Sequence, residues 1–198
     1  MPVEVVAHML SDQNISRRLQ FQLILQCAPF LKGIKVACIM NLERRFLWEL
    51  REILEGTGIS YQVLAICKER CLIILFRRKE MEAYLQREEI REFLGEYGYV
   101  MQDLNGTFQR LAERIDRYSR QDICFPHEIG AFLDYPVEDV RGFIENDGQG
   151  CLMTGYWKVY HNRERAQLTF LAYDQARTSA VNEFLVGKSI RDIVYSVA

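Results

Sequence analysis

Alternation of hydrophobic and polar positions predicts four β-strands in this chain, at residues 34–40, 59–67, 71–76 and 151–160. Apolar residues fill both faces of the first run after Val36, which is typical of an inner strand. The second and third runs are separated only by Lys68, Glu69 and Arg70, so we expect them to form a β-hairpin.

Apolar residues at helical spacing predict helices in most of the remaining chain. One helix should run from Ile15 to Ala28, because a proline disfavours the α conformation in the residue before it and Pro29 follows. A second should begin after Asn41, which is a suitable N-cap. Further helical patterns cover residues 81–94 (one bent helix or two short ones), 104–118, 163–186 and 190–194, the last capped by Ser189.

The segment from residue 125 to residue 160 holds the residues with the strictest conformational demands. Pro126 and Pro136 each suit the first turn of a helix, where a φ of about −65° is already correct and no N–H is needed. Two short helices are therefore expected, the second ending at Asn146, Asp147 and Gly148. We expect the strand at 151–160 to fold back against them.

Together these elements predict an α/β or α+β fold, with a mixed sheet of about four strands covered by about six helices. No repeat, low-complexity tract or linker rich in Pro, Gly or Ser divides the chain. Residues 1–198 are therefore expected to form a single domain.

The charge balance narrows the classes of partner. A formal net charge of −2 and a pI near 6.0 leave no overall positive field, so neither general nucleic-acid binding nor adherence to a membrane surface is expected. The two short helices could form a helix-turn-helix, but the segment carries one arginine, Arg141, against several acidic residues and would repel DNA phosphates.

The number of cysteines and the length of the apolar runs bear on the cellular compartment of the protein. Six cysteines in 198 residues are too few for a disulfide-dense scaffold, and neither a secretion signal nor an apolar run of the ~20 residues that a membrane helix needs is found. A cytoplasmic protein without a membrane segment is expected. Cys67, Cys71, Cys124 and His127 could form a zinc site, but their spacing does not match paired C-x-x-C motifs, so no metal is expected.

His127 and Glu128 are the candidate catalytic residues. Imidazole titrates near neutrality and the pKa of a partly buried carboxyl can rise towards it, so the two side chains could transfer protons. The alternative is structural, because the helix dipole alone favours a glutamate near a helix N-terminus. No dinucleotide-binding glycine motif, Walker A loop, nucleophile elbow or H-E-x-x-H motif occurs, and the sequence does not identify a cofactor.

Tyr156, Lys158 and Tyr160 share one face of the predicted strand 151–160. Such a face could hold an anion or a planar ring by charge and stacking, or it could be the solvated face of an edge strand. Asn146 and Cys27 complete the candidate ligand-binding residues. Cys27 is expected at the C-terminus of a helix, where the dipole raises a thiol pKa and disfavours a thiolate nucleophile.

Several motifs resemble the signature of the domain-of-unknown-function family 3793. They are Cys27-Ala28-Pro29, residues 125–130, Tyr135-Pro136 with Asp139-Val140, residues 142–144 and residues 155–160. The resemblance covers residues 20–185, and it implies anaerobic Gram-positive bacteria and an association with iron-uptake and flavodoxin-type redox genes, but no assigned activity. A glycine is expected from that pattern where this chain has Asp134, so the turn there could be shaped differently.

Two functions are expected from these observations. The first is an accessory protein that binds a partner protein or a small redox- or iron-linked ligand, anionic or aromatic, in a cleft where the helix at 126–133 meets the strand at 151–160. The alternative is an enzyme acting on a small anionic or aromatic molecule, with His127 and Glu128 in proton transfer and Lys158 holding the anion.

Overall fold

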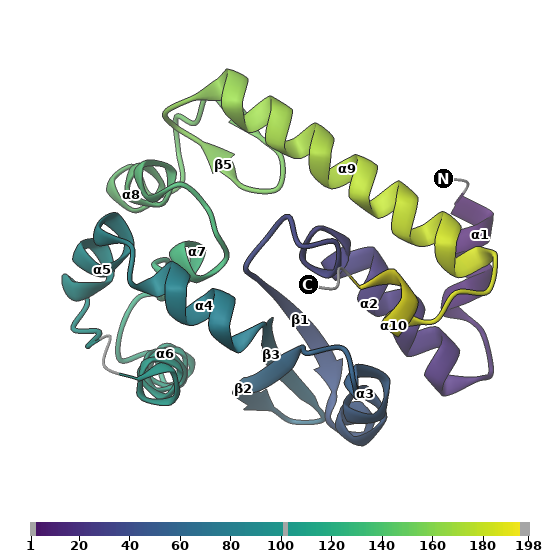
Figure 1. Ribbon diagram of the computed structural model, residues 1–198. Coiled ribbons are helices and arrows are strands. Elements are labelled where there is room, and N and C mark those ends of the chain that lie inside the picture. The colour runs from purple at the N-terminus through teal and green to yellow at the C-terminus, as the bar shows by residue number, and fades with distance from the viewer. Residues whose placement is uncertain (1–2, 101–102, 195–198) are drawn as a thin grey trace.

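The computed structural model describes residues 3–100 and 103–194, and it shows a mixed α+β fold (Figure 1). In chain order the elements are α1 (Val3–Leu10), α2 (Ile15–Leu31), β1 (Ala37–Glu43), the 3₁₀ turn η1 (Arg44–Phe46), α3 (Leu47–Leu54), β2 (Ser60–Cys67), β3 (Arg70–Phe76), α4 (Arg78–Leu85), α5 (Glu88–Gly95), α6 (Leu104–Ser119), α7 (Ile129–Phe132), α8 (Val137–Glu145), β4 (Met153–Thr154), β5 (Lys158–Val159), α9 (Arg163–Leu185) and α10 (Ile190–Ile193).

The central sheet has three antiparallel strands in the order β1-β3-β2. Side chains alternate between its faces, so Met40, Ile73 and Leu75 enter one core with α2, α9 and α10, whereas Ile74 and Phe76 enter a second core with α4 to α8. In the strand order given above, β1 lies at the edge of the sheet. The expectation of an inner strand is therefore wrong. Both of its faces are apolar because helices cover both sides of the sheet.

The hairpin predicted between the second and third strands is confirmed. Cys67 pairs with Arg70 across a two-residue turn, in which Lys68 has a φ of 51°. A left-handed residue is what a tight hairpin loop requires.

The fourth predicted strand does not join this sheet, so the expectation of a four-stranded mixed sheet is wrong. Residues 151–160 instead form a small separate hairpin in which Met153 pairs with Val159 and the chain reverses at Gly155. A Cβ at Gly155 would lie 2.1 Å from the ring of Phe170, so the turn sits directly against α9. The alternation of apolar and polar residues over 151–160 comes from the two short strands of this hairpin, which pack on helices.

Two helix boundaries also differ from the predictions. α2 continues through Pro29 to Leu31, because Ala28, Phe30 and Leu31 are fully buried and their packing outweighs the local effect of the proline. Asn41 does not cap a helix: it lies in β1, where it pairs with Leu72.

Pro126 and Pro136 do not begin the two short helices as expected: α7 starts at Ile129, three residues after Pro126, and Pro136 is the extended residue that precedes α8. The remaining helical predictions are confirmed, with residues 81–94 forming two helices, α4 and α5. Ser189 caps α10 in a reciprocal pair with Asp192. The structure has more helices than the six or so expected, and the single-domain expectation stays a prediction.

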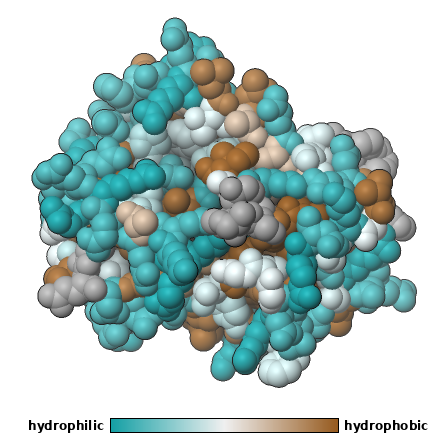
Figure 2. Space-filling model, in the orientation of Figure 1, coloured by the Kyte–Doolittle hydropathy of each residue, from teal (hydrophilic) through white to brown (hydrophobic). Residues whose placement is uncertain are grey.

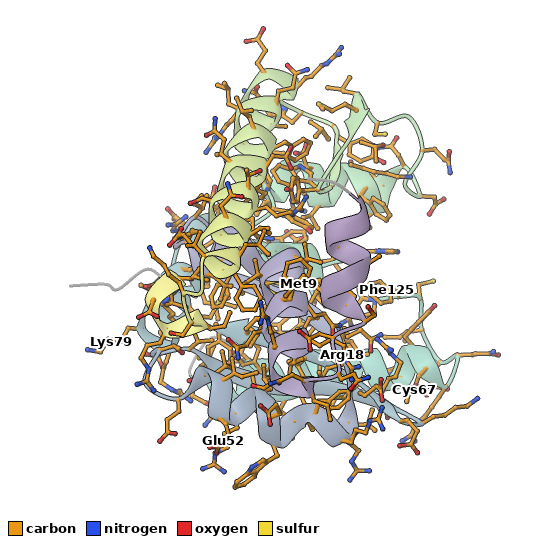
Figure 3. The ribbon with its side chains drawn as sticks, turned by 90° about the vertical axis from the view of Figure 1, so that its right-hand side faces the viewer. Met9, Arg18, Glu52, Cys67, Lys79 and Phe125 are labelled. Carbon is orange, nitrogen blue, oxygen red and sulfur yellow. The ribbon has the colours of Figure 1, made fainter. Side chains whose placement is uncertain are left out.

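The long helix α9 organises one side of the molecule (Figures 1 and 3). It packs along α2, its first turns lie beside β5, and its last turns lie near α1. Hydrophilic side chains cover most of the face seen in Figure 2, with hydrophobic side chains in small separate areas. Among the described residues, no helix combines the length and the apolar character needed to cross a bilayer.

Candidate functional site

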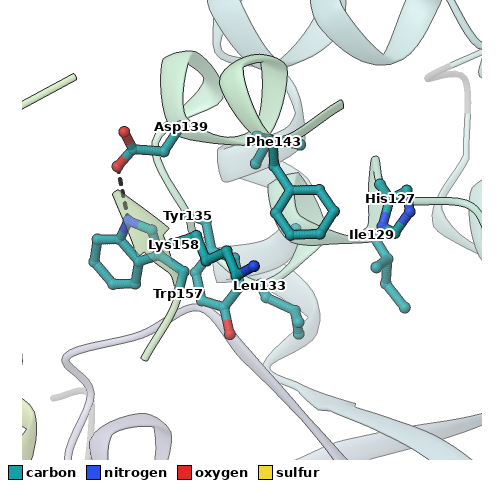
Figure 4. Close-up of a pocket in the computed structure, with 10 residues that line it drawn as sticks. His127, Ile129, Leu133, Tyr135, Asp139, Phe143, Trp157 and Lys158 are labelled. Atoms are coloured by element: carbon teal, nitrogen blue, oxygen red, sulfur yellow. Dashed lines mark hydrogen bonds between the residues drawn. The ribbon is translucent and has the colours of Figure 1, made fainter. Parts of the chain in front are cut away.

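A cavity of about 180 Å³ lies where the start of α7, the inner face of α8 and strand β5 meet (Figure 4). This is the place where the sequence predicted a cleft. Its wall is mainly apolar and aromatic, and its lining residues are His127, Ile129, Gly130, Leu133, Tyr135, Asp139, Val140, Phe143, Trp157 and Lys158.

Asp139 joins the two sides of this cavity. Its side chain is only 3% exposed, yet both carboxylate oxygens are satisfied. The indole nitrogen of Trp157 donates to Oδ2 at 2.7 Å, and the backbone N–H groups of Tyr160 and His161 donate to Oδ1 at 2.7 and 2.8 Å. A carboxylate in the first turn of α8 thus holds the β4-β5 hairpin against that helix.

Two stacked rings form one wall. Tyr135 and Trp157 lie 5.1 Å apart with an interplanar angle of 29°, and Phe170 from α9 meets the indole edge-on at 4.5 Å. Burial raises the pKa of Tyr135 to about 12, so its hydroxyl stays protonated at neutral pH. The wall is therefore uncharged, and it is supported by packing against α9.

Lys158 supplies a positive charge to the cavity. Its ammonium donates to the backbone oxygen of Gly148 at 2.7 Å and lies 5.7 Å from the centre of the Phe143 ring. An ammonium has three N–H donors, so this hydrogen bond leaves donors for an anion.

His127 lies on the opposite side of Phe143 from Tyr135 and Trp157 (Figure 4). Its ring is 4.7 Å from that of Phe143 and 5.1 Å from that of Phe125. Burial lowers the pKa of His127, although the charges of Glu128 and Asp147 oppose the shift. The imidazole is thus neutral near pH 7 and can donate or accept one hydrogen bond.

Glu128 does not face the cavity with His127. Its carboxylate is 1% exposed, forms an ion pair with Arg114 of α6 and accepts a hydrogen bond of 3.1 Å from the hydroxyl of Tyr99. Both residues lie in the turn before α7 rather than in its first helical turn, so the side chains diverge.

The predicted strand face of Tyr156, Lys158 and Tyr160 is also divided, because the segment is a hairpin. The hydroxyl of Tyr156 donates to Asp174 of α9 at 2.8 Å, and its ring packs on that helix. Tyr160 lies over Gly142, so that a Cβ added to Gly142 would be 2.6 Å from the Cβ of Tyr160. Of the three, only Lys158 lines the cavity.

The remaining two candidates lie outside the cavity. Asn146 ends α8 and its side-chain amide donates to the oxygen of Gly142 at 2.7 Å. Cys27 is fully buried between α2 and β1, with its sulfur 2.8 Å from that of Cys38. Within residues 3–100 and 103–194, no three His, Cys, Asp or Glu side chains group closely enough to hold a metal ion.

Sequence reasoning missed Tyr135, Asp139, Phe143 and Trp157 as site residues. The helix dipole favours an acidic residue such as Asp139 in the first turn of α8, but it does not account for the three hydrogen bonds that this residue accepts. An acidic residue directly before Val140, on the helical face that carries the apolar residues, is the signal that could have indicated a buried acceptor.

At Asp134, where a glycine was expected, φ is +61°. This left-handed conformation is the one that favours glycine, so the turn keeps the shape that a glycine would give it. Asp134 also accepts a hydrogen bond from the backbone of Val36, which ties the turn to the start of β1.

Comparison with known protein families assigns the chain to a family. Neither the curated proteins nor the solved structures include a match to it. The family model described as "Protein of unknown function (DUF3793)" matches residues 23–194, which is most of the chain. The protein therefore belongs to this family, whose signature the sequence motifs resemble.

Proposed function

We propose that the protein binds a small aromatic or largely apolar molecule that carries an anionic group, in the cavity between α7, α8 and β5. The observation that supports this proposal is a single lysine, Lys158, set in a lining that is otherwise mainly aromatic and aliphatic. Apolar contact would supply most of the affinity, and the ammonium would select and orient the anion.

The volume limits the size of the ligand. A cavity of about 150 Å³ holds benzene in another protein. The cavity here, at about 180 Å³, has room for one aromatic ring with a small substituent.

The polar groups suggest how such a molecule would lie. Phe143 and Trp157 offer ring faces and edges for stacking, Lys158 would bind the carboxylate, and neutral His127 would form a hydrogen bond at the far end. Asp139 would not contact the ligand by charge, since its oxygens already accept three hydrogen bonds. Its role would be to position Trp157.

This arrangement favours binding over the alternative of acid–base catalysis by His127 and Glu128. The carboxylate of Glu128 is engaged by Arg114 and Tyr99 on the other side of the turn, so it is not available to a substrate in the cavity. A partner protein and a redox- or iron-linked ligand stay predictions.

Trp157 provides a direct measurement of binding. The chain has two tryptophans, and Trp48 is 68% exposed on α3, so Trp48→Phe leaves the cavity indole as the only one. Titration of this variant with benzoate, and with benzyl alcohol as its uncharged counterpart, should give a saturable change in emission that is stronger for the anion.

Lys158→Met should remove the preference for benzoate, by about tenfold in Kd for a charge-assisted hydrogen bond. Lys79→Met, at an exposed position on α4, is the matched control and should bind as the parent does. A flat titration with benzoate and a wider series of single-ring carboxylates, or equal affinities in all three proteins, would overturn the proposal.

A further inference from the structure

Two thiols and an amine form a cluster behind the Tyr135 wall of the cavity. Cys27 on α2 and Cys38 on β1 bring their sulfur atoms to 2.8 Å, and a disulfide needs about 2.05 Å. The two residues are 0% and 7% exposed, respectively. Only a small movement separates the thiol pair from a covalent bond.

Lys35 brings a positive charge to this pair. Its side chain is largely buried, with the ammonium 4.9 Å from the centre of the Tyr135 ring and 5.6 Å from that of Tyr173. Burial lowers the pKa of Lys35, while the charges of Cys38, Asp134 and Cys27 raise it. The lysine and the cysteines thus influence one another directly.

The two thiols are not equivalent. The hydrogen bond with Cys27 lowers the pKa of Cys38, and Lys35 lowers it further, while burial opposes both. Burial raises the pKa of Cys27 well above its usual value, and the same hydrogen bond adds to that shift. Cys38 therefore ionises first, and Cys27 then donates its S–H to the thiolate.

We propose that Cys27 and Cys38 form a redox-active dithiol that a small hydroperoxide oxidises to a disulfide linking α2 to β1. Because Cys27 is 0% and Cys38 is 7% exposed, a bulky disulfide such as oxidised glutathione has no open approach to the pair, and the proposed oxidant is therefore a small hydroperoxide. The inference does not depend on whether the cavity binds a ligand.

The chemistry is a two-electron oxidation. The Cys38 thiolate attacks one peroxide oxygen, the O–O bond breaks, and the leaving oxygen takes a proton to form water or an alcohol. Cys38 is then a sulfenic acid. The sulfur of Cys27 attacks that of Cys38, the S–S bond forms, and the S–O bond breaks, with the proton of Cys27 leaving in a second water molecule. The two thiols lose two electrons, and the peroxide gains them.

The test uses the folded full-length protein with Cys67→Ser, Cys124→Ser and Cys151→Ser. These positions lie outside the buried set, so the background keeps Cys27, Cys38 and the isolated buried thiol of Cys71 as an internal control. After limited hydrogen peroxide and alkylation of the remaining thiols, trypsin cuts after Lys32 and Lys35. A disulfide then links the peptides 19–32 and 36–44, which mass spectrometry identifies.

The expected result is this linked pair, formed while Cys71 stays alkylated and the far-UV circular dichroism spectrum is unchanged. The proposal is overturned if Cys71 oxidises as fast as the pair, or if Cys38 stops at a sulfenic acid with Cys27 free. Oxidation by glutathione disulfide as fast as by hydrogen peroxide would overturn the choice of oxidant and make the pair a thiol–disulfide exchange site.

Lys35→Met, measured in the same background, tests the charge; trypsin no longer cuts at this position, so the linked peptides in this variant are 19–32 and 33–44. It keeps the length and apolar stem of the side chain and should slow oxidation several-fold while the fold is retained. The exposed Lys79→Met should leave the rate unchanged. Equal rates in the two variants would remove Lys35 from the proposed site.

Discussion

The indole nitrogen of Trp157 donates a hydrogen bond of 2.7 Å to a carboxylate oxygen of Asp139, across 18 residues of sequence. The other carboxylate oxygen binds two consecutive backbone N–H groups, those of Tyr160 and His161. One buried carboxylate therefore accepts hydrogen bonds from three donors of a hairpin whose own two strands are short. The shape of the proposed cavity depends on this contact, because it sets the position of the indole.

Asp139→Ala should destabilise the protein by roughly 2–4 kcal/mol, because it leaves three partly buried donors without their acceptor. Glu138→Ala, in the same helical turn but exposed, should change stability by less than about 0.5 kcal/mol. Urea unfolding at neutral pH gives both values. Similar losses in the two variants would contradict the central role of Asp139.

Asp139→Asn tests the geometry of the same contact. An amide can accept from the backbone groups but presents N–H donors to the indole nitrogen of Trp157, so two donors face each other. We expect this cost to be relieved in the double variant Asp139→Asn, Trp157→Phe. Strict additivity of the two substitutions in a double-mutant cycle would mean that the side chains are not coupled.

Glu128→Gln should destabilise the protein by about 3 kcal/mol, because it leaves Arg114 as a partly buried charge without its partner. His127→Gln should change stability much less, since His127 is half-buried and packs by ring contact alone. It should instead alter the response of Trp157 to benzoate. A stable Glu128→Gln protein would show that the ion pair is not a structural element of the turn.

Gly142→Ala should be destabilising by about 1–3 kcal/mol, because its Cβ would lie 2.6 Å from Cβ and Cγ of Tyr160. Gly95→Ala is a matched control in another helix, α5, where nothing lies within 4 Å of the added methyl group. That variant should be stabilised slightly, by up to about 0.5 kcal/mol, because Gly95 is the last residue of the helix and helix propensity counts for less there than in the interior. Thermal unfolding midpoints that move in opposite directions would confirm both predictions.

Glu183 should make stability depend on acid pH. Hydrogen bonds from Lys32, Lys188 and Ser179 lower the pKa of Glu183 to about 2, with Lys32 as the largest cause. Because this pKa lies below the usual value of 4.5, the stabilisation is complete above pH 4.5 and is lost as pH falls towards 2. The side chains of Glu183 and Lys32 are each 21% exposed, and after solvent screening we expect a contribution of about 1 kcal/mol.

The check is the difference in unfolding free energy between the parent protein and Glu183→Gln. It should shrink by more than half between about pH 6 and about pH 3. Glu164→Gln, at an exposed position in the first turn of the same helix, is the control and should not show this dependence. A constant difference across the range would contradict the lowered pKa.

The sequence by itself determined the local structure wherever neighbouring residues suffice. The β2-β3 hairpin, α6, α9 and the Ser189 cap follow from spacing and turn chemistry. The region of the cavity was also predictable, because Pro126 and Pro136 restrict the backbone on both sides of it. The extension of α2 past Pro29 was not, because burial of Phe30 and Leu31 overrides a local preference.

Only the tertiary structure decided which side chains share a site. Residues 153–159 alternate as a single strand would, but their pairing partners are within the segment, so Tyr156 turns to α9 while Lys158 turns to α8. His127 and Glu128 are adjacent in sequence, yet the carboxylate of Glu128 forms an ion pair with Arg114 and does not face the cavity. Such directions depend on contacts between residues far apart in the chain, and a pattern of neighbouring residues does not contain them.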